Sequence, residues 1–431
     1  MEHVVSSFGD SYADVAVIGA GASGLMAANA AAAQKPAGVV IFERNGRAGR
    51  KLSITGKGRC NITNNAEKEQ FMRNIPGNGN FLFSAFSKMS NRDIVSFFER
   101  NGVGVTLERG DRFFTKSGSA REVTDMLVGM AEDRGVNIVF NARVASVKPA
   151  ISADADVLRR FEIKLADGRI FFARSVILAT GGITYPSTGS TGDGYRFAEG
   201  FGHSISQPRP SLVPLETVET WPYGLTGLSL KNVTLKLYSP DGGKVFSKLG
   251  EMLFTHFGVS GPLVLSGSRA LLDYGFKGCT AKIDLKPGLS DEKLRARIAR
   301  DFQLYSKKSL RNAMADLLPA RLIPVVIAEA GLVPETRADT VGKAGAAKLS
   351  EVLKGLKLTI KAPRPASEAI VTAGGVRTAE INPSTMESKL TPGLYFCGEL
   401  IDVDAYTGGF NLSIAFATGH VAGTSARSRV S

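Results

Sequence analysis

The feature that most constrains the fold is the stretch from residue 14 to residue 43, in which a glycine-rich turn separates two short apolar segments. Residues 14–18 are apolar and rich in β-branched side chains, which predicts a buried strand, and residues 39–42 predict a second one. Between them, a GxGxxG turn at 19–24 opens an alanine-rich segment, 25–33, with the composition of a helix packed closely against a sheet. This order of elements predicts an α/β fold.

The glycines of this turn have separate tasks. Gly19 permits the tight turn, Gly21 lets a pyrophosphate approach the backbone, and Gly24 lets the helix lie close to the strand. The free N–H groups at the start of the helix favour phosphates. Glu43 follows the second strand, where an acidic side chain accepts hydrogen bonds from a ribose 2′-OH. Together these features predict a dinucleotide-binding site.

Length and composition limit the classes of protein that fit. A chain of 431 residues is too long for one minimal core, so two or three lobes are expected. No stretch approaches the ~18 consecutive apolar residues of a membrane span, and residues 1–13 predict a loose leader and not a signal peptide. Cys60, Cys279 and Cys397 are too scattered for a disulfide framework or a zinc site. We therefore expect a cytoplasmic protein without a bound metal.

The chain is basic, with 53 Lys and Arg residues against 40 Asp and Glu and a formal net charge of +13. Such a charge is compatible with contact to nucleic acid or to an anionic membrane. No dense run of Lys and Arg stands out, however, so a basic background combined with an anionic cofactor is the simpler interpretation. We therefore predict a small-molecule substrate and no membrane partner, and we do not favour nucleic acid.

Two further loops and a late helix start resemble the first turn in composition. Residues 46–64 combine Gly, Lys, Arg and Asn, which suits a loop around a polyanion, although a solvated basic loop is the alternative. The predicted strand 174–178 ends in Ala-Thr-Gly-Gly at 179–182, which places bare backbone beside a ligand. Near the carboxyl end, Gly408 and Gly409 precede a predicted helix at 412–423, whose start is a second preformed anion site.

The sequence pattern divides the chain into an interrupted lobe and an insertion. Residues 14–204 and 359–431 share the style of strands followed by glycines. Residues 205–288 alternate apolar and polar side chains, as a small antiparallel sheet or barrel does, and 289–358 have helical spacing broken by prolines. Within the first lobe we also predict a helix at 81–101, a strand at 136–147, and a hairpin of strands 161–165 and 170–172.

With these segments described, the chain resembles the bacterial FAD-dependent oxidoreductases that include aminoacetone oxidases and bile-acid reductases. The resemblance covers about residues 14–425. It implies a Rossmann-like FAD lobe that is interrupted by an insertion with a β-barrel part and an α-helical part. The motifs that carry it are, in chain order, VIGAGASGLMAA, GRKLSITGKGRCNITN, ATGGITYPSTGSTGDGY, GEMLFTHFGVSGP, TAGGV and GLYFCGELIDVDAYTGGFNLSIAFATG.

The resemblance also implies the cofactor contacts. The GxGxxG turn would hold the pyrophosphate of FAD, Glu43 the adenosine ribose, and the backbone of Val144 the adenine. Glu399 stands where many relatives have an aspartate, so it stays open which carboxylate approaches the ribityl chain and the phosphate of FAD. The complete predicted cofactor-binding set is Gly19, Gly21, Ala22, Ser23, Gly24, Glu43, Arg44, Lys51, Lys57, Arg59, Cys60, Asn61, Val144, Thr180, Gly181, Gly398, Glu399, Asp402, Gly409, Phe410 and Asn411.

Two residues are candidates for the chemistry. His256 lies in Gly250–Pro262, a predicted glycine-rich loop of the insertion, and could act as a general acid or base, or it could bond to a loop carbonyl. Tyr406 precedes the glycines at 408 and 409 and could orient a substrate, or it could pack against the flavin ring. Cys60 and Cys397 have no partner thiol in the sequence and are interpreted as small packing residues.

The predicted function is hydride transfer between FAD and a small amine, amino ketone or enone, with dioxygen or NAD(P)H as the other reactant. A flavin-dependent tRNA-modifying or RNA-binding protein is the alternative, and a flavin-loaded binding module without turnover is a third. After Gly24 the chain has no second strand-led GxGxxG, so NAD(P)H is expected only as a transient donor. The substrate, the choice between oxidase and reductase, and the oligomeric state stay open.

Overall fold

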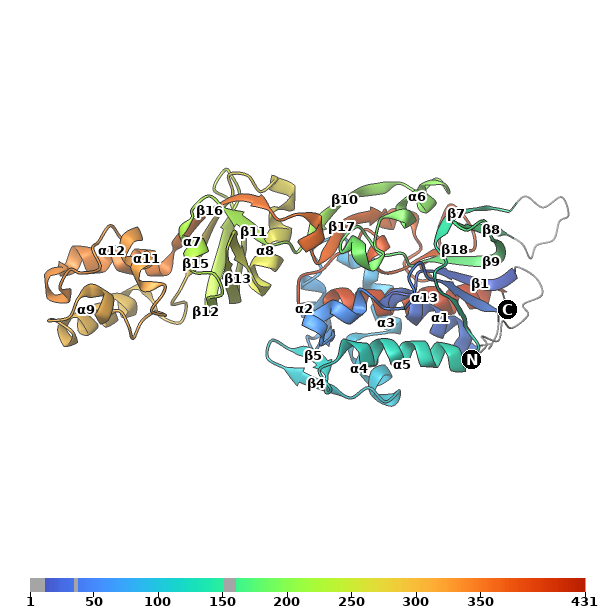
Figure 1. Cartoon of the computed structure of the whole chain (residues 1–431), viewed down its shortest axis with the longest axis horizontal. Helices are drawn as coiled ribbons and strands as arrows, with labels where there is room; N and C mark the ends of the chain where they lie inside the picture. The colour runs from blue at the N-terminus through green and yellow to red at the C-terminus, as the bar shows by residue number, and fades with distance from the viewer. Residues whose placement is uncertain (1–11, 35–37, 151–159, 431) are drawn as a thin grey trace. The chain divides into compact units, whose positions relative to one another are not determined.

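The computed structural model describes residues 12–34, 38–150 and 160–430 (Figure 1). They form two compact units, the first from residues up to 210 and from 370 onward, the second from 211–369. The second border lies later than the predicted 358/359, because strand β16 (Leu356–Pro363) pairs with two strands of the second unit. Of the predicted leader, residues 1–11 lie outside the described residues, and the last two already belong to β1 (Tyr12–Ile18).

The first unit is built on a seven-stranded mixed sheet with the order β6-β2-β1-β9-β8-β7, and β18 pairs with β9. The strands β6, β2, β1, β9 and β18 are parallel, and the apolar side chains of β2, of β18 and of residues 15–18 and 176–178 are buried on both faces. Besides β1, the strands are β2 (Val39–Phe42), β6 (Asn137–Val139), β7 (Val144–Pro149), β8 (Phe161–Leu165), β9 (Ile170–Leu178) and β18 (Leu394–Phe396).

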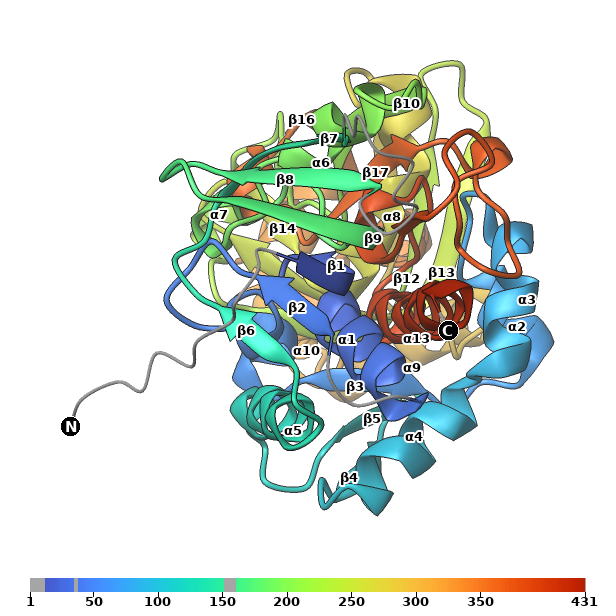
Figure 2. The same ribbon diagram turned by 90° about the vertical axis from the view of Figure 1, so that its right-hand side faces the viewer.

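Two long helices, α1 (Ala22–Gln34) and α13 (Phe410–Val430), lie side by side against this sheet (Figure 2). A Cβ atom added at Gly419 would lie 2.3 Å from the carbonyl oxygen of Ser23, and one at Gly423 would lie 2.0 Å from that of Ala27. Only glycine therefore allows the two backbones to approach this closely. The helix α13 extends beyond the predicted 412–423, to the fully buried Arg427, which donates a 3.0 Å hydrogen bond to Asp14.

Two predictions for the first unit are wrong. The predicted helix 81–101 is divided at Ser90, which begins a new helix by forming a capping box with Asp93. The predicted strand 136–147 is two strands, β6 and β7, because the chain turns at Asn141 with a φ of +53°. The other elements of this unit are η1 (Leu52–Gly58), β3 (Asn61–Asn64), α2 (Lys68–Arg73), η2 (Gly79–Leu82), α3 (Phe83–Lys88), α4 (Asn91–Arg100), β4 (Val105–Glu108), β5 (Arg112–Thr115), α5 (Ala120–Asp133), η3 (Pro186–Thr188), α6 (Asp193–Glu199), β10 (Ile205–Ser211), β17 (Val371–Val376), η7 (Thr378–Glu380) and η8 (Gly398–Leu400). The short η6 (Ala366–Glu368) lies at the end of the second unit.

The second unit contains the predicted barrel, closed in the order β11-β14-β13-β12-β15-β16. The segment Gly250–Pro262 is largely strand and not a loop, because residues up to 255 continue β13 and those from 258 form β14. Its elements are β11 (Leu215–Thr217), α7 (Trp221–Gly224), β12 (Ser229–Tyr238), β13 (Lys244–Thr255), β14 (Gly258–Ser260), α8 (Pro262–Leu271), η4 (Leu272–Tyr274), β15 (Thr280–Asp284) and β16.

The helical part of the second unit follows the barrel strands β11–β15 and precedes β16. Its helices are α9 (Asp291–Leu304), α10 (Leu310–Ala313), α11 (Ile323–Glu329), η5 (Ala338–Thr340) and α12 (Gly342–Lys354). Pro324 stands in the first turn of α11 and so helps to begin that helix, where its missing N–H costs nothing. An ion pair of 2.7 Å between Lys354 and Asp284 ties α12 to the barrel strand β15.

Candidate cofactor site

Four parallel strands of the first unit end at the same level. In the registers of the sheet, Ile18 pairs with Phe42 and with Leu178, and Leu178 pairs with Phe396. The glycine-rich turn at 19–24, the loop after Glu43, the loop after residue 178 and the loop after residue 396 therefore leave from one edge. Ligands of open α/β sheets bind at this carboxyl edge. The structure thus brings the predicted cofactor loops together.

The glycines of the first turn meet three different surroundings. A Cβ atom added at Gly24 would lie 1.9 Å from the carbonyl oxygen of Gly19, and one added at Gly19 would lie 2.7 Å from that of Ala179. A Cβ atom at Gly21, in contrast, would meet nothing within 4 Å. Two glycines are therefore required by packing, whereas the third faces open space. That space adjoins the first turn of α1, whose N–H groups have no acceptor inside the helix, so it fits a pyrophosphate.

Glu43 is buried at the end of β2, with 7% of its surface exposed. Its carboxylate accepts hydrogen bonds from the backbone N–H of Ala20 (2.8 Å) and from the N–H and side-chain amide of Asn45 (2.8 and 2.6 Å). A carboxylate offers about four lone-pair sites, so it can still accept a ribose hydroxyl. The neighbouring Arg44 instead binds the start of α6, through Asp193 at 3.2 Å.

Lys51 and Glu399 form an ion pair that joins the predicted loop 46–64 to the loop after β18. The Lys51 ammonium donates to Glu399 at 2.6 Å and to the hydroxyl of Thr184 at 2.8 Å. The other oxygen of Glu399 accepts hydrogen bonds from Thr184 (3.0 Å) and from the backbone N–H of Thr372 (2.9 Å). Both oxygens of the carboxylate are therefore engaged by the protein, and Glu399 fixes the loop after β18 against β17.

The loop that precedes β3 is unusual in its backbone. Lys57 and Cys60 are not glycines, yet their φ angles are +59° and +54°. Strained residues of this kind concentrate at ligand-binding sites. Arg59 between them pairs with Glu108 and lies over the ring of Phe114, 4.4 Å from its centroid. Cys60 is fully buried, and burial raises the pKa of its thiol to about 12, so it stays protonated.

The loop after β18 touches the first turn directly. A Cβ atom added at Gly398 would lie 2.4 Å from the hydroxyl oxygen of Ser23, and the Gly398 N–H donates to Thr418 of α13 at 2.9 Å. Cys397, one position earlier, is fully buried, and burial raises the pKa of its thiol to about 12. The predicted residues Ser23 and Gly398, far apart in the sequence, are therefore neighbours.

The start of α13 is held by strand β3. Gly409 has a φ of +99°, and a Cβ atom there would lie 2.5 Å from the backbone of Thr63. With its amide oriented to satisfy both of its polar atoms, Asn61 accepts a hydrogen bond from the Gly409 N–H at 3.0 Å. Asn411 closes the turn before the helix by bonding both backbone groups of Ala405, at 3.0 and 2.8 Å. Phe410 packs edge-on against Phe71.

The remaining predicted cofactor residues lie around the same edge. Val144 is buried at the start of β7, and Thr180 with Gly181 follows β9. The backbone N–H of Asp402 donates to Val376 at 3.0 Å, and its carbonyl oxygen accepts from the side chain of Asn78 at 2.7 Å. The exposed Lys57 lies outside this packed set.

Several residues near the site were not predicted from the sequence. Thr184 and Asp193 lie inside the predicted loop ATGGITYPSTGSTGDGY, so the motif indicated the loop but not these two contacts. Tyr195 has a buried hydroxyl without a hydrogen-bond partner in the described part of the chain. Burial, together with the carboxylates of Glu399 and Asp402, raises the pKa of Tyr195. No sequence signal separates it from an ordinary core tyrosine.

The two predicted catalytic residues lie in different units. Tyr406 belongs to the first unit, where its backbone N–H donates to the carbonyl oxygen of Asn74 at 2.9 Å. His256 belongs to the second, where it is exposed in the turn between β13 and β14, edge-on against Phe257. Among residues 12–34, 38–150 and 160–430, no group of His, Cys, Asp and Glu side chains could hold a metal ion.

The model of the HI0933-like protein Rossmann domain matches residues 13–425. The chain belongs to the HI0933-like family. One relative is the 3-dehydro-bile acid delta(4,6)-reductase of Clostridium scindens, 32% identical over 96% of this chain and 99% of the relative. Another is the ribosomal RNA dihydrouridine synthase of Haemophilus influenzae, 32% identical over 95% of this chain and 97% of the relative.

The fold of this HI0933-like protein also matches solved structures. The 3-ketosteroid delta1-dehydrogenase of Sterolibacterium denitrificans, in complex with 1,4-androstadiene-3,17-dione, aligns with a TM-score of 0.50 at 13% identity, over 97% of this chain and all of that one. At this identity the likeness concerns the fold alone. Family membership identifies the chain as an FAD-dependent oxidoreductase. In the structurally described chain, no helix has the length and apolar character needed to cross a membrane.

Proposed function

We propose that this protein reduces a carbon–carbon double bond conjugated to a carbonyl group. In the overall reaction, the acceptor gains a hydride at its β-carbon and a proton at its α-carbon, while NAD(P)H gives up the hydride and becomes NAD(P)⁺. When bound, FAD would supply the hydride relay between the two. Of the three predicted substrate classes, amine, amino ketone and enone, we therefore retain only the enone.

One observation carries this proposal. The names of the two curated relatives describe the same transformation on different molecules. A 3-oxo steroid with double bonds at positions 4 and 6 is a conjugated dienone, and uridine has a C5=C6 bond conjugated to its C4 carbonyl. Saturating the dienone bond at position 4 or the uridine C5=C6 bond requires hydride addition at the position β to a carbonyl. Both relatives match this chain over nearly its full length. We therefore assign to this chain the chemistry that the two relatives share, and not the substrate of either one.

The residues of this chain would hold and orient the reactants. The turn at 19–24 would bind the pyrophosphate, Glu43 the ribose, and the start of α13, with Asn61 at its side, the flavin. Backbone N–H groups at that helix start favour negative charge on the flavin. Tyr406 and His256 are our candidates for delivering the proton to the α-carbon.

The hydride donor is proposed to be NADH or NADPH at the same face as the acceptor. The sequence has no second GxGxxG, so a separate, tightly held nicotinamide site has no motif to form it. Donor and acceptor would then alternate, and steady-state kinetics should be ping-pong. A ternary-complex pattern would contradict a shared face.

The test is anaerobic stopped-flow spectroscopy of the FAD-loaded protein. NADH or NADPH should bleach the flavin absorbance, and a 4,6-dien-3-one steroid or a uridine-containing RNA should then restore it. His256→Ala and Tyr406→Phe should slow reoxidation by the acceptor while FAD content stays intact. A flavin that is bleached by nicotinamide but is reoxidised only by dioxygen, with neither acceptor consumed, would rule out the proposal.

RNA as the acceptor is the second candidate function. The charge favours it: residues 211–369 hold 23 basic and 15 acidic residues, whereas the longer remainder holds 30 and 25. The insertion therefore carries +8 of the total +13, and basic surfaces attract phosphates. The discriminating measurement is filter binding of ribosomal RNA at increasing salt. Binding that is weak at low salt and insensitive to salt would exclude RNA and leave a small dienone.

A further inference from the structure

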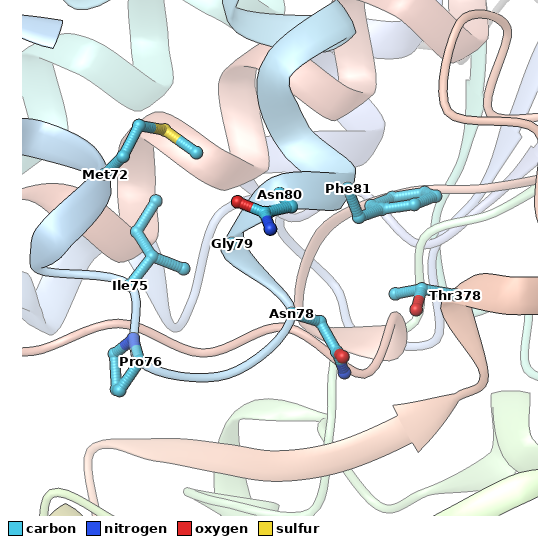
Figure 3. Close-up of a pocket in the computed structure, with 8 residues that line it drawn as sticks. All are labelled: Met72, Ile75, Pro76, Asn78, Gly79, Asn80, Phe81 and Thr378. Carbon is cyan, nitrogen blue, oxygen red and sulfur yellow. The ribbon is translucent and has the colours of Figure 1, made fainter. Parts of the chain in front are cut away.

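A pocket of the first unit lies beside the cofactor site and is lined by none of the predicted cofactor-binding or catalytic residues. Its volume is about 520 Å³, within the range of small-molecule sites. It opens between the turn that follows α2 and the start of η7. Figure 3 shows Met72, Ile75 and Pro76 on one side, and Phe81 with Thr378 on the other. We call this cavity the amide pocket. Its lining residues are Met72, Ile75, Pro76, Asn78, Gly79, Asn80, Phe81 and Thr378.

The amide pocket is lined without a charged side chain, although 93 of the 431 residues of the chain are charged. Its polar groups are two amides, Asn78 and Asn80, and the hydroxyl of Thr378. Neither the Asn80 amide nor the Thr378 hydroxyl bonds to another described residue. An amide both donates and accepts hydrogen bonds. The pocket therefore fits a neutral ring that carries a carbonyl group, and it offers no cation to a phosphate or carboxylate.

Both walls of the amide pocket are fastened to Asp402. On one side, the Asn78 side chain donates to the carbonyl oxygen of Asp402 at 2.7 Å. On the other, the Asp402 N–H donates to Val376 at 3.0 Å, two residues before Thr378. Asp402 lies in the segment that leads from Gly398 to the start of α13. A ligand in the pocket would therefore contact residues that are bonded to the segment from Gly398 to the start of α13, which is also expected to contact the flavin.

Two further contacts join the pocket wall to the start of α13. The carbonyl oxygen of Asn74 accepts the N–H of Tyr406 at 2.9 Å, and Phe71 packs edge-on against Phe410 with centroids 4.9 Å apart. Asn78 itself holds a φ of +53°, and its side-chain bond to Asp402 helps to fix that conformation. The wall is therefore one packed body with the residues expected around the flavin.

We propose that the amide pocket binds the conjugated carbonyl ring of the electron acceptor, a proposal that rests on the function proposed above. Asn80 and Thr378 would bond the carbonyl or an adjacent N–H, and Phe81 with Met72 would cover the ring faces. The shared chemistry is a neutral ring with a carbonyl conjugated to a double bond. A 3-oxo-4,6-diene steroid and the uracil base of RNA both meet this description, and separate arms of the test distinguish them.

The experiment compares Asn80→Ala, Phe81→Ala and Thr378→Val with the controls Phe83→Ala and Asn312→Ala. Phe83 and Asn312 are exposed and do not line the pocket, and Asn80 is also exposed, so its truncation should not disturb folding. Each FAD-loaded variant is titrated with the steroid dienone, or with a uridine-containing RNA oligonucleotide, while the flavin spectrum is recorded. Acceptor KM is then measured, together with the rates of flavin reduction by nicotinamide and of reoxidation by ferricyanide.

We expect all three pocket variants to weaken acceptor binding. Acceptor KM should rise about fivefold in Asn80→Ala and Thr378→Val, which each lose one hydrogen bond, and at least as much in Phe81→Ala, which loses the contact with the ring face. The nicotinamide and ferricyanide rates should match the controls. An effect in only one arm identifies the acceptor. If the wild type reduces an acceptor but the pocket variants keep KM within twofold of the controls, the pocket assignment is overturned. If the wild type reduces neither acceptor, the proposed function fails, and the pocket assignment fails with it.

Discussion

The loops that follow β1 and β18 serve the same edge of the sheet but are held in different ways. After β1, the turn is closed by a local contact, because Gly24 fits against the carbonyl oxygen of Gly19 five positions earlier, and the contact of Gly19 with Ala179 adds one distant support. After β18, the shape depends on distant partners. These pairs are Ser23 with Gly398, Asn61 with Gly409, Asn74 with Tyr406, and Asn78 with Asp402.

This difference predicts different responses to mutation. In the local loop, a Cβ atom at Gly19 or Gly24 would meet backbone that cannot move, so each of these two glycines has an all-or-none role in the fold. In the distributed loop, several hydrogen bonds of about 1 kcal/mol each share the task, so losing one should loosen the site without unfolding the chain.

The largest effect is expected for Gly24→Ala. The new Cβ atom would lie 1.9 Å from the Gly19 carbonyl oxygen, and the helix α1 would have to move off the sheet. We expect destabilisation of at least about 3 kcal/mol, the upper end for overpacking. Circular dichroism and thermal unfolding of the purified variant would measure it. A variant with wild-type thermal stability would contradict the close packing of α1 on the sheet.

Gly21→Val should remove the cofactor but not the fold. The Cβ of this side chain points into space with no protein atom within 4 Å, the space assigned to the pyrophosphate. Apo-protein Tm should stay within about 3 °C of the wild-type apo-protein, a change of roughly 1 kcal/mol. The purified variant should be colourless, whereas the wild type should release FAD on denaturation. Full flavin content in Gly21→Val would refute the assignment of this turn.

Asn61→Ala tests the distributed loop after β18. It removes the hydrogen bond to Gly409 at the start of α13, worth about 1 kcal/mol. We expect FAD affinity to fall about fivefold while the protein stays folded, as measured by fluorescence titration of apo-protein with FAD. Asn65→Ala is the matched control, because Asn65 is exposed one position beyond β3. Equal FAD affinity in both variants would mean that the helix start is held without Asn61.

Features that depend on neighbouring residues could be predicted from the sequence, whereas features that depend on distant partners could not. The strands at 39–42 and 161–165 were predicted residue for residue, because their signals are contiguous, whereas the predicted strands 170–172 and 174–178 are one strand, β9. The break at Ser90 was missed, because helical spacing continues across it and only the side-chain cap decides. The ion pair of Lys51 with Glu399 and the amide pocket could not be predicted. They join residues hundreds of positions apart, and single-sequence patterns carry no such information.

His203 gives a pH-dependent test of the support behind β18. It lies buried edge-on against Phe396, between Glu380 at 3.2 Å and Ser388 at 2.8 Å. Burial lowers the pKa of His203, although Glu380 opposes this, so the folded state holds the neutral ring. The unfolded chain takes up a proton below about pH 6.5. The free energy of unfolding should therefore be largest above that pH and should fall as the pH drops towards the lowered value.

The measurement is the urea midpoint of unfolding at pH 7.5, 6.5 and 5.5. His203→Gln should be less stable at every pH and should lose less stability on acidification than the wild type. His420 is a second histidine whose pKa is lowered, by burial and by Lys88, so His420→Gln is the parallel control. An unchanged pH dependence in His203→Gln would mean that His203 does not support β18 through its neutral form.

The smallest effect concerns the two cysteines of the site. Burial raises the pKa of both Cys60 and Cys397 to about 12. At pH 8 only roughly one thiol in ten thousand is then ionised, and the thiolate is the form that reacts. Iodoacetamide should therefore leave both unmodified in the native FAD-loaded protein and should label them after denaturation. Cys60→Ala and Cys397→Ala should keep wild-type flavin content.

The relative labelling rate of the two thiols measures how firmly each of the two loops is held. Cys397 begins the loop after β18, which distant partners hold, whereas Cys60 is enclosed by the short turn from Thr55, whose carbonyl oxygen accepts its N–H at 3.1 Å. If both thiols react only through global unfolding, mass spectrometry should find equal labelling rates at low urea. Faster labelling of Cys397 would show that the loop after β18 opens on its own. In that case the distant contacts hold it less firmly than one local turn holds Cys60.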